Sequence, residues 1–344
     1  MTASHPEQLD FEPPSRIAVI GAGLAGLAAA RDLKDAGFRV KLFDKGRGVG
    51  GRTSSRRTHD FTFDHGAQYF TARDARFSKL VASARELGIV EPWRGEVVQL
   101  GAAGPEALTG DTERFVGVPT MSSLARHLAS DLDVDCGVQV DSVQRNGSDL
   151  FLFSEGISLG QYAGLICTLP AGQVPALLGE VTTLAALVSS VSMQPCWSVM
   201  LGFDRALDVP FDGAFVDASP LSWVARNSSK PGRPDREAWV LHAGPDWTTD
   251  YWNATPELVI ESLTQAFADR AGTQLPAPVH AVAHRWRYSL PDPPLNEGSL
   301  YDPRSRIALA GDWCHGARIE GAVGSGWSAA ARLIADESLA ALRR

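Results

Sequence analysis

Three glycines near the start of the chain are spaced for binding a nucleotide diphosphate. Gly21, Gly23 and Gly26 follow the apolar run 16–20 and open a helical pattern that ends near Gly37. In such a turn the first glycine permits a tight bend, the second lets the backbone approach a pyrophosphate, and the third lets the helix pack closely on the strand. The free N–H groups at the start of that helix would face the phosphates. This order of elements predicts a dinucleotide site.

An acidic residue and a basic, glycine-rich loop narrow the choice of dinucleotide. A second apolar run, 39–43, ends in Asp44, which stands 23 residues after Gly21, near the distance at which an acid meets a ribose hydroxyl. Residues 45–53 then place four glycines and three cations directly beyond this strand. An NAD-dependent dehydrogenase has no evident use for such a loop, whereas FAD continues past its pyrophosphate into a ribityl chain that the loop can cover. The sequence therefore predicts FAD.

The C-terminal part of the chain supplies the second half of the expected flavin site. The apolar run 306–310 leads into Gly311 and Asp312, and a glycine-rich stretch at 321–326 opens a last helix. Asp312 can accept hydrogen bonds from ribityl hydroxyls. The positive end of the helix can stabilise an anionic reduced flavin at its N1/O2 edge. A third segment, 164–171, has the pattern of a strand followed by a Thr-x-Pro turn, and we expect it to cross the same domain.

Several longer segments resemble one family of flavoproteins. The loop residues Gly50, Gly51 and Arg52 resemble the GGR segment of the FAD-dependent amine-oxidase superfamily. A closer similarity, to the bacterial renalase-like flavoproteins within it, is carried by the segments 64–74 (DHGAQYFTARD), 223–231 (WVARNSSKP), 284–286 (HRW), 311–314 (GDWC) and 320–322 (EGA). These motifs are long and unusual, so they are far more specific than a glycine turn alone.

The resemblance implies a particular reaction. Members of this family hold FAD without a covalent bond and oxidise isomeric (2- or 6-) dihydro-NAD(P) to NAD(P)+, after which oxygen reoxidises the flavin and gives hydrogen peroxide. By the same resemblance, Gln68 and Tyr69 lie close to the isoalloxazine. Cys314 falls in the segment next to the flavin, where a thioether is conceivable, but the resemblance implies non-covalent FAD.

The predicted site has two parts, one for the cofactor and one for the substrate. The expected cofactor contacts are Gly21, Gly23, Leu24, Ala25, Gly26, Asp44, Lys45, Gly50, Gly51, Arg52, Gln68, Val140, Thr168, Gly311, Asp312, Glu320, Gly321 and Ala322. The expected catalytic and substrate contacts are Gln68, Tyr69, Trp223, Arg226, His242, His284 and Trp286.

Each residue predicted to contact the substrate could bind it for a chemical reason, and each could instead have an ordinary structural role. Trp223 and Trp286 can stack on a nicotinamide, although most tryptophans serve packing. His242 and His284 can hydrogen-bond a carboxamide, although a lone strand histidine is as often a satisfied core residue. The loop 226–236 carries four basic side chains against one acid, so Arg226 could meet a pyrophosphate; a solvated loop is the ordinary outcome of such a run.

Composition excludes several classes of protein. The formal net charge of −8 argues against a nucleic-acid surface, and the chain carries no apolar stretch long enough to span a membrane. The four cysteines are widely spaced, without a zinc-site pattern, which predicts no metal site and favours a reducing compartment. Residues 1–15 are polar and lack the features of a signal peptide. We therefore expect a cytoplasmic monomer whose partners are a small dinucleotide substrate and oxygen.

The expected fold is α/β: a Rossmann-type FAD-binding domain, p-hydroxybenzoate-hydroxylase-like, with an inserted mixed-sheet substrate domain. We assign 14–75, 116–175 and 291–344 to the FAD-binding domain. Residues 76–115 and 176–290 form the substrate-binding domain, with helices at 74–87 and after Thr255 and strands at 198–203 and 238–243.

Three other functions compete with this interpretation. An FAD-dependent amine oxidase of the same fold would want an acidic group for an ammonium, which the basic loop disfavours. A non-catalytic FAD-binding protein would be favoured by a missing flavin-contact glycine, and none is obviously missing. An NAD-dependent dehydrogenase is disfavoured by the glycine-rich loop 45–53 and by the segment after residue 306.

Overall fold

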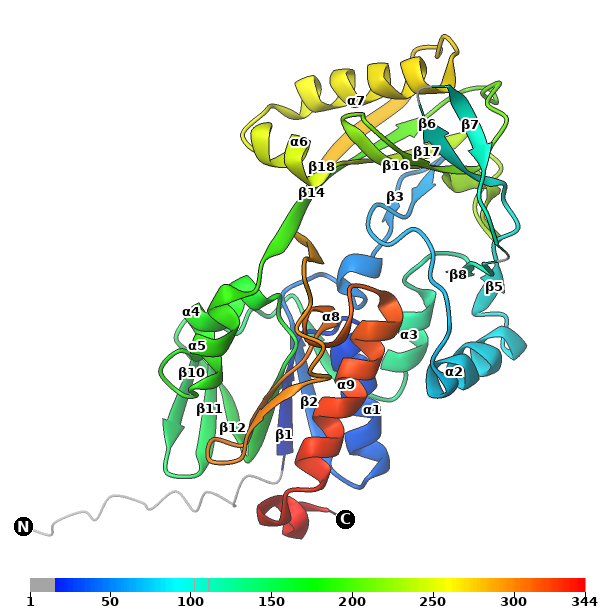
Figure 1. Cartoon of the computed structure of the whole chain (residues 1–344). Helices are drawn as coiled ribbons and strands as arrows, with labels where there is room; N and C mark the ends of the chain where they lie inside the picture. Colours follow the sequence, from blue (N-terminus) through cyan, green and yellow to red (C-terminus); the bar gives the residue numbers. More distant parts are fainter. Residues whose placement is uncertain (1–15, 102, 111, 344) are drawn as a thin grey trace, which may run out of the picture.

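The chain is built around two sheets that lie at opposite ends of the molecule (Figure 1). The computed structural model describes residues 16–101, 103–110 and 112–343. The predicted fold class, an α/β fold with a Rossmann-type domain and a mixed-sheet second region, is confirmed. The exact domain boundaries stay a prediction.

The first sheet is the six-stranded one that carries the predicted nucleotide site. Its strands, in order across the sheet, are β19 (Leu300–Asp302), β20 (Ile307–Leu309), β13 (Gly164–Cys167), β1 (Arg16–Ile20), β2 (Arg39–Asp44) and β9 (Asp133–Cys136). All pair in parallel except β19, which runs antiparallel to β20. Parallel strands need crossovers, so their carboxyl ends meet at one edge, where ligands of such sheets bind.

Alternating residues of β1 explain how this sheet is covered on both faces. Ile17 and Val19 pack with the helices α1 (Leu24–Asp35) and α9 (Ile319–Ile334), whereas Ala18 and Ile20 pack toward a second layer. That layer is an antiparallel sheet of β10 (Ser142–Asn146), β11 (Asp149–Ser154) and β12 (Ile157–Tyr162). A strand buried on both faces is continuously apolar, which is the pattern that the sequence showed.

The second sheet has seven strands and is mixed. Its order is β18 (His280–Pro291), β14 (Met193–Gly202), β17 (Ala238–Ala243), β16 (Leu221–Arg226), β15 (Gly213–Val216), β6 (Val97–Gly101) and β7 (Gly104–Ala107). Only β15 and β6 pair in parallel. Figure 1 shows β14 and β18 running from this sheet toward the six-stranded sheet, so they join the two regions.

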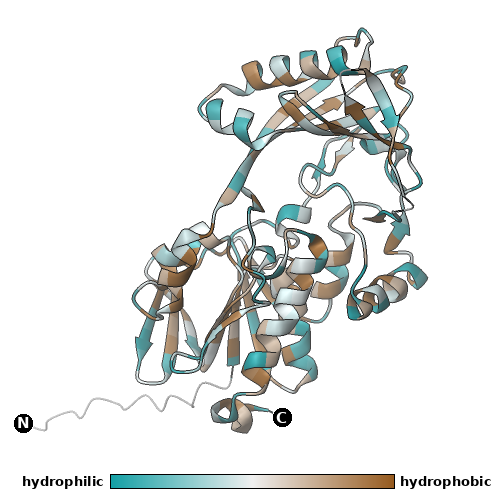
Figure 2. Cartoon of the chain, viewed as in Figure 1, coloured by the Kyte–Doolittle hydropathy of each residue, from teal (hydrophilic) through white to brown (hydrophobic). Residues whose placement is uncertain are grey.

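The two faces of the seven-stranded sheet differ in what they bury. Trp239 and Leu241 of β17 pack against α7 (Pro256–Ala271), which lies beside α6 (Pro245–Asp250) on the outer face. Val240 of the same strand packs with β4 (Thr62–Phe63) on the inner face, and His242 has the same orientation. Figure 2 shows apolar residues concentrated along the strands and the inner sides of the helices. The inner face of the seven-stranded sheet is therefore the face available for a substrate site.

The remaining elements connect or cap the two regions. The helices are α2 (Ala75–Glu86), α3 (Ser123–Ala129), α4 (Val174–Leu178), α5 (Leu184–Leu187) and α8 (Asp312–His315). The strands are β3 (Arg56–Arg57), β5 (Val90–Pro92) and β8 (Phe115–Gly117). The 3-10 turns are η1 (Gly51–Thr53), η2 (Ala171–Gln173), η3 (Val188–Ser190), η4 (Asn227–Ser229) and η5 (Glu337–Leu342).

Local signals set the starts of the two predicted helices. The Asp74 carboxylate accepts from the backbone N–H groups of Arg76 and Phe77, and Thr255 caps α7 with Pro256 in the first position. Both helices are confirmed. In the described ranges no helix is long and apolar enough to cross a membrane.

Candidate cofactor and substrate site

Two helices, α1 and α9, begin at the predicted cofactor site without a side-chain cap. α1 starts after Gly23 and α9 starts after Arg318, and neither residue caps its helix through a side chain. The helices pack closely, because a Cβ on Gly326 of α9 would stand 2.1 Å from the carbonyl oxygen of Ala25 in α1. Uncapped helix N-termini offer free N–H groups and a positive dipole end. The start of α1 suits a diphosphate, and the start of α9 is the one predicted to face the N1/O2 edge of the flavin.

The three glycines of the first turn have the geometry that a dinucleotide site needs. Gly21 has a φ of +102°, and a Cβ on Gly26 would stand 1.9 Å from the Gly21 carbonyl oxygen. The space beside Gly23 is open, because apart from its chain neighbours no heavy atom lies within 4 Å of where a Cβ would stand. Thr168 packs against this turn, and its hydroxyl donates to Ile20 O at 3.0 Å. The open space next to uncapped N–H groups is a cradle that a pyrophosphate would fill.

Asp44 is held in place by the two loops that it separates. Its Oδ2 accepts from the Ala22 N–H at 2.7 Å and its Oδ1 accepts from the Gly46 N–H at 2.6 Å. The Gly50 N–H donates to Ala22 O at 2.8 Å, which docks the glycine-rich loop onto the first turn. Each carboxylate oxygen keeps acceptor capacity for a ribose hydroxyl. Lys45 is exposed on this loop.

Arg52 and Asp312 bind each other. The guanidinium donates to both carboxylate oxygens at 2.7 Å, and it also donates to Ser289 O at 2.9 Å. Asp312 is buried, so this bidentate pair keeps its charge compensated. The pair ties the glycine-rich loop, the C-terminal segment and the end of β18 together. The contact of Asp312 with ribityl hydroxyls stays a prediction.

Glu320, Gly321 and Val140, which the sequence predicted as contacts of the cofactor, each make close contacts within the protein. Glu320 turns its carboxylate to the start of α2, where Oε1 accepts from the N–H groups of Arg73 and Asp74 at 2.7 and 2.6 Å. Gly321 packs against the backbone of Gly316, where a Cβ would stand 2.1 Å from the carbonyl oxygen. Val140 is a buried core residue. Glu320 and Val140 therefore have clear packing or capping roles beside any contact with FAD.

A row of polar and aromatic side chains crosses the inner face of the seven-stranded sheet. The strand register places Trp223 of β16 opposite His242 of β17, His242 opposite Ser198 of β14, and Ser198 opposite His284 of β18. Residues directly opposite each other in a sheet point to the same face. The predicted contacts Trp223, His242, His284 and, two residues further along β18, Trp286 are therefore brought together on one surface.

His65, which the sequence did not single out, closes this row. Its ring lies 5.0 Å from that of His284 and is stacked 5.1 Å from that of Trp286. Its backbone carbonyl accepts from Trp286 Nε1 at 2.9 Å and lies 3.3 Å from His242 Nε2. Because a carbonyl oxygen only accepts, His242 carries its proton on Nε2 and keeps Nδ1 free as an acceptor.

The segment around His65 also touches the cofactor loop. The Ala67 N–H donates to Arg52 O at 2.9 Å, and a Cβ on Gly66 would stand 2.0 Å from that same oxygen. No larger residue fits between the two loops at Gly66. The aromatic row is therefore next to the loop that is expected to cover the flavin.

The three histidines of the row are uncharged near neutral pH. Burial lowers the pKa of His65 to about 3, and its neighbours His284, Arg56 and His242 act in the same direction. Burial also lowers the pKa of His242 to about 4 and that of His284 below its usual value. A neutral imidazole offers one donor and one acceptor, so this wall can bind a ligand through hydrogen bonds without carrying charge.

Tyr69 belongs to a second aromatic group next to the row. Its ring lies 5.4 Å from Trp223 and 6.4 Å from Trp93, and Phe215 lies 4.7 Å from Trp223. Trp223 is thus shared by both groups. Tilted and edge-on pairs of this kind are the arrangements that aromatic rings prefer.

Directly beside the neutral row lies a charged cluster that the sequence did not predict. The Asp64 carboxylate accepts from Arg233 Nη2 at 2.6 Å and lies 3.5 Å from Lys230 Nζ, and all three side chains are fully buried. Lys230 also donates to Gln68 Oε1 at 3.0 Å, while Gln68 Nε2 donates to Gly66 O at 3.1 Å. Gln68, a predicted catalytic residue, is therefore fully engaged in holding the loop that carries His65.

This cluster corrects the expectation of an exposed positive patch at 226–236. Lys230 and Arg233 are buried against Asp64, and only Arg236 of the four basic residues is exposed. Arg226 donates to Leu207 O at 3.1 Å and Val209 O at 3.0 Å. It also pairs with Glu237 at 3.3 Å and Asp212 at 3.6 Å. Arg226 serves as an anchor of the second sheet and presents no free guanidinium to a pyrophosphate.

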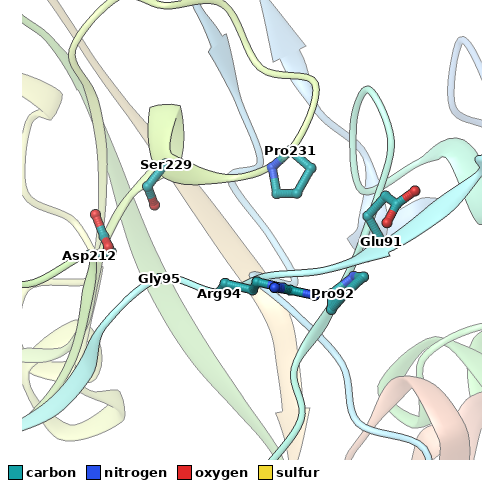
Figure 3. A pocket seen from close by; sticks show the side chains of 7 residues that line it. All are labelled: Glu91, Pro92, Arg94, Gly95, Asp212, Ser229 and Pro231. Atoms are coloured by element: carbon teal, nitrogen blue, oxygen red, sulfur yellow. The ribbon is translucent and has the colours of Figure 1, made fainter.

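A cavity of about 490 Å³ opens elsewhere in the molecule (Figure 3). It is lined by Glu91, Pro92, Arg94, Gly95, Asp212, Ser229 and Pro231. The Trp93 indole donates to Oγ of the lining residue Ser229 at 3.0 Å, and its ring lies 6.4 Å from that of Tyr69. No residue predicted for cofactor or substrate lines it.

Cys314 has no reactive character. Its side chain is buried, its Sγ donates to Leu309 O at 3.6 Å, and burial raises the pKa of the thiol well above its usual range. A thiol of this kind forms little thiolate and acts as a small apolar residue. In the described residues no cluster of His, Cys, Asp or Glu side chains could hold a metal ion.

Comparisons with known families agree with this geometry. A family model described as flavin containing amine oxidoreductase matches residues 101–334, and one described as an NAD(P)-binding Rossmann-like domain matches residues 19–84. The chain belongs to the flavin containing amine oxidoreductase family. It is therefore a flavoprotein oxidoreductase with FAD as its cofactor. The cradle beside Gly23 and the two uncapped helices fit this cofactor.

Curated relatives match over short stretches. The chain is 40% identical over 97 residues to a 4,4'-diapolycopene oxygenase of Methylomonas sp, a match that covers 25% of this chain and 20% of that protein. It is 49% identical over 51 residues to a 4,4'-diapophytoene desaturase of Staphylococcus aureus strain Newman, covering 15% of this chain and 10% of that protein. The chain thus spans a fifth or less of the length of these relatives.

Solved structures share the fold over nearly the whole chain. An Exiguobacterium protein assigned as a protoporphyrinogen oxidase has a TM-score of 0.78 at 13% identity, covering 94% of this chain and 99% of that one. Putrescine oxidase bound to putrescine has a TM-score of 0.71 at 16% identity, covering 94% and 100%. At these identities the likeness establishes the fold alone.

Proposed function

We propose that this flavoprotein oxidises isomeric dihydro-NAD(P) to NAD(P)+ by hydride transfer to FAD, with oxygen as the final acceptor. The observation that carries the proposal is the uncharged wall of His65, His242, His284 and Trp286 beside the Arg52 loop. A dihydronicotinamide is a neutral, flat ring with one carboxamide. Aromatic side chains suit its faces, and neutral imidazoles suit its amide.

The reaction makes few demands on acid–base chemistry. A dihydropyridine that loses a hydride becomes an aromatic cation and releases no proton, so no general base is required. What the chain must supply is a fixed orientation and a dry site. The buried rings of Trp223 and His65, together with the half-buried ring of Trp286, exclude water, and the free Nδ1 of His242 can accept from the carboxamide N–H.

The remaining residues serve the cofactor. When bound, FAD supplies the ring that accepts the hydride, and oxygen then takes the two electrons with protons to form hydrogen peroxide. The start of α1 would hold the phosphates, the start of α9 would face the N1/O2 edge of the flavin, and Asp44 would hold a ribose hydroxyl. We propose that FAD is held without a covalent bond, since the buried thiol of Cys314 is protonated and engaged with Leu309 O.

An amine oxidase of the same family is the second candidate. Its support is the family itself and the aromatic group of Tyr69, Trp93 and Trp223, which could surround an ammonium. The carboxylates nearest the row oppose it, because Asp64 and Asp312 are buried and paired with basic side chains. An ammonium would find no free counter-charge in these two groups.

Anaerobic reduction of the flavin separates the candidates. The FAD-loaded protein is mixed with NAD that has been reduced by borohydride to a mixture of isomers, and in parallel with authentic NADH, benzylamine and spermine. We expect the isomer mixture alone to bleach the flavin absorption within seconds. Bleaching by an amine would replace our proposal with the amine-oxidase one. No bleaching by any compound would favour a non-catalytic FAD-binding protein.

A further inference from the structure

Three buried polar atoms without a partner lie on the aromatic row. Among the described residues, His65 Nδ1, Ser198 Oγ and Trp223 Nε1 are buried and make no hydrogen bond. His65 and Trp223 are each 6% exposed and Ser198 is 0% exposed. A buried polar atom without a partner costs free energy, so folded proteins rarely keep several of them in one place. Their common position suggests that a ligand satisfies them.

The strand register explains why these atoms share one place. Ser198 stands between His242 and His284, with Trp223 beyond His242, and directly opposite side chains on adjacent strands have Cβ atoms about 5 Å apart. The ring of His65, which belongs to the segment 64–74 and not to this sheet, lies against the ring of His284. The five side chains therefore form one row on the inner face of the sheet, beside the cofactor loop.

The available atoms on this surface match an amide. Trp223 Nε1 is a donor only, His242 Nδ1 is an acceptor, and Ser198 Oγ can be either. A primary amide carries a donor NH2 and an acceptor oxygen in one plane and has no charge. A carboxylate has no donor and an ammonium has no acceptor, and each would bring an uncompensated charge into a site of neutral groups.

We propose that His65 and Ser198 complete a subsite for the primary amide of the substrate. His65 is a specificity-determining contact through Nδ1. Ser198 stands between the imidazoles of His242 and His284, and its unpartnered Oγ is the second contact for the amide. The substrate class, a dihydronicotinamide, rests on the proposed function, but the preference for an amide is a property of this surface alone.

A binding experiment tests the subsite without turnover. Nicotinamide, 3-acetylpyridine and benzoate are titrated into the FAD-loaded, oxidised protein, and the perturbation of the flavin spectrum reports binding. We expect nicotinamide to bind about tenfold more tightly than 3-acetylpyridine, which keeps the carbonyl but lacks the NH2 group, and benzoate not to bind. Equal affinities for nicotinamide and 3-acetylpyridine would overturn the proposal.

Matched variants assign the effect to His65. His65→Phe keeps a ring against Trp286 but removes Nδ1, and we expect it to abolish the preference for nicotinamide. His65→Asn places an amide oxygen near the position of Nδ1 and should restore most of the preference, which a merely structural role would not do. The control is His280→Phe, since His280 is stacked on Phe63 at 5.5 Å, four residues before His284 on the same strand. A preference that survives in His65→Phe would refute the role of His65.

The role of Ser198 is read from kinetics. In Ser198→Ala we expect KM for the isomeric dihydro-NAD(P) mixture to rise about tenfold while the limiting rate of flavin reduction changes little, because positioning of the amide is lost and the flavin is unaffected. For the corresponding reduced mixture from 3-acetylpyridine adenine dinucleotide, which lacks the NH2 group, we expect Ser198→Ala to change KM little. A parallel loss for both mixtures would reject the contact between Ser198 and the amide.

The two proposals fail in different ways. If nicotinamide binds with the expected preference but no dihydro-dinucleotide bleaches the flavin, the subsite stands and the proposed reaction is wrong. If both dinucleotide mixtures bleach the flavin equally well, the reaction stands and the amide subsite is wrong.

Discussion

Two neighbouring residues, Asp64 and His65, are both buried and have opposite relations to their surroundings. Asp64 accepts from Arg233, from the Met121 N–H at 3.0 Å and from Ser55 Oγ at 2.6 Å. His65 has a neutral ring whose Nδ1 has no partner. One position is saturated with hydrogen bonds and the other leaves an atom available.

The difference shows how this chain separates structure from binding. A buried charge without a partner is so costly that it must be compensated within the fold, and its atoms are then unavailable to a ligand. A neutral imidazole costs less to leave unpaired, and it keeps a hydrogen-bonding atom for the ligand. The charged cluster of Asp64, Lys230 and Arg233 therefore fixes the loop, and the neutral row next to it is left to bind.

The largest effect is expected from breaking the charged cluster. Asp64→Asn keeps the shape of the side chain but leaves Lys230 and Arg233 buried without an anion. We expect the free energy of unfolding, measured by urea denaturation of the FAD-loaded protein, to fall by about 3–5 kcal/mol. The exposed Asp60→Asn is the control and should change stability by less than about 0.5 kcal/mol. A fully stable Asp64→Asn protein would show that the cluster is not needed to compensate charge.

A smaller effect is expected from the pH dependence of Lys230. Burial lowers the pKa of Lys230 to about 8, despite the attraction of Asp64. Between about pH 8 and the unfolded pKa of about 10.4, the unfolded chain holds a proton that the folded chain has lost, so stability rises with pH. Lys230→Met should remove this rise in stability. The ion pair of Asp64 with Arg233, which has no net charge, would remain. Identical stability profiles of the two proteins over this range would contradict the lowered pKa.

The substitution His65→Phe in the neutral row, in contrast to Asp64→Asn, should hardly change the free energy of unfolding. His65→Phe removes an unpaired polar atom and keeps the stacking on Trp286, so we expect the free energy of unfolding to stay within about 1 kcal/mol of the native value. The same urea titration that is applied to Asp64→Asn measures it. A loss as large as that of Asp64→Asn would mean that His65, too, is a structural residue.

The sequence predicted the parts of the site that are encoded locally. Gly21, Gly23 and Gly26 lie within six residues, and the physical demands of a phosphate turn are met inside that span. The burial of Lys230 and Arg233 could not be predicted in the same way, because the partner of Arg233 is Asp64, 169 residues earlier in the chain. A basic run is normally solvated, and only the folded chain brings the acid to it.

Ser198 shows a different limit of sequence reasoning. It lies in an apolar strand with no motif around it, and its position depends on the register of β14 with both β17 and β18. The pairing of three strands that are distant in sequence sets that register. His65 was within a recognised segment, 64–74, but nothing local distinguishes a ring that stacks on Trp286 from one exposed to solvent.

The smallest effect is an expected absence of pH dependence. Because burial lowers the pKa of His65 to about 3 and that of His242 to about 4, both rings stay neutral between pH 5.5 and 8. The rate constant for flavin reduction, measured by anaerobic stopped flow at saturating substrate, should therefore show no step from the titration of these two rings in this range.

Stability, in contrast, should respond to pH below 6.5. The unfolded chain then binds protons on these histidines and the folded chain does not, so the free energy of unfolding decreases as the pH falls from 6.5 toward 4. His242→Phe and His65→Phe should each reduce this decrease. A reduction rate that titrates near pH 6.5 and loses that titration in His65→Phe would show that the row is charged during the reaction, and the contrast between Asp64 and His65 would then fail.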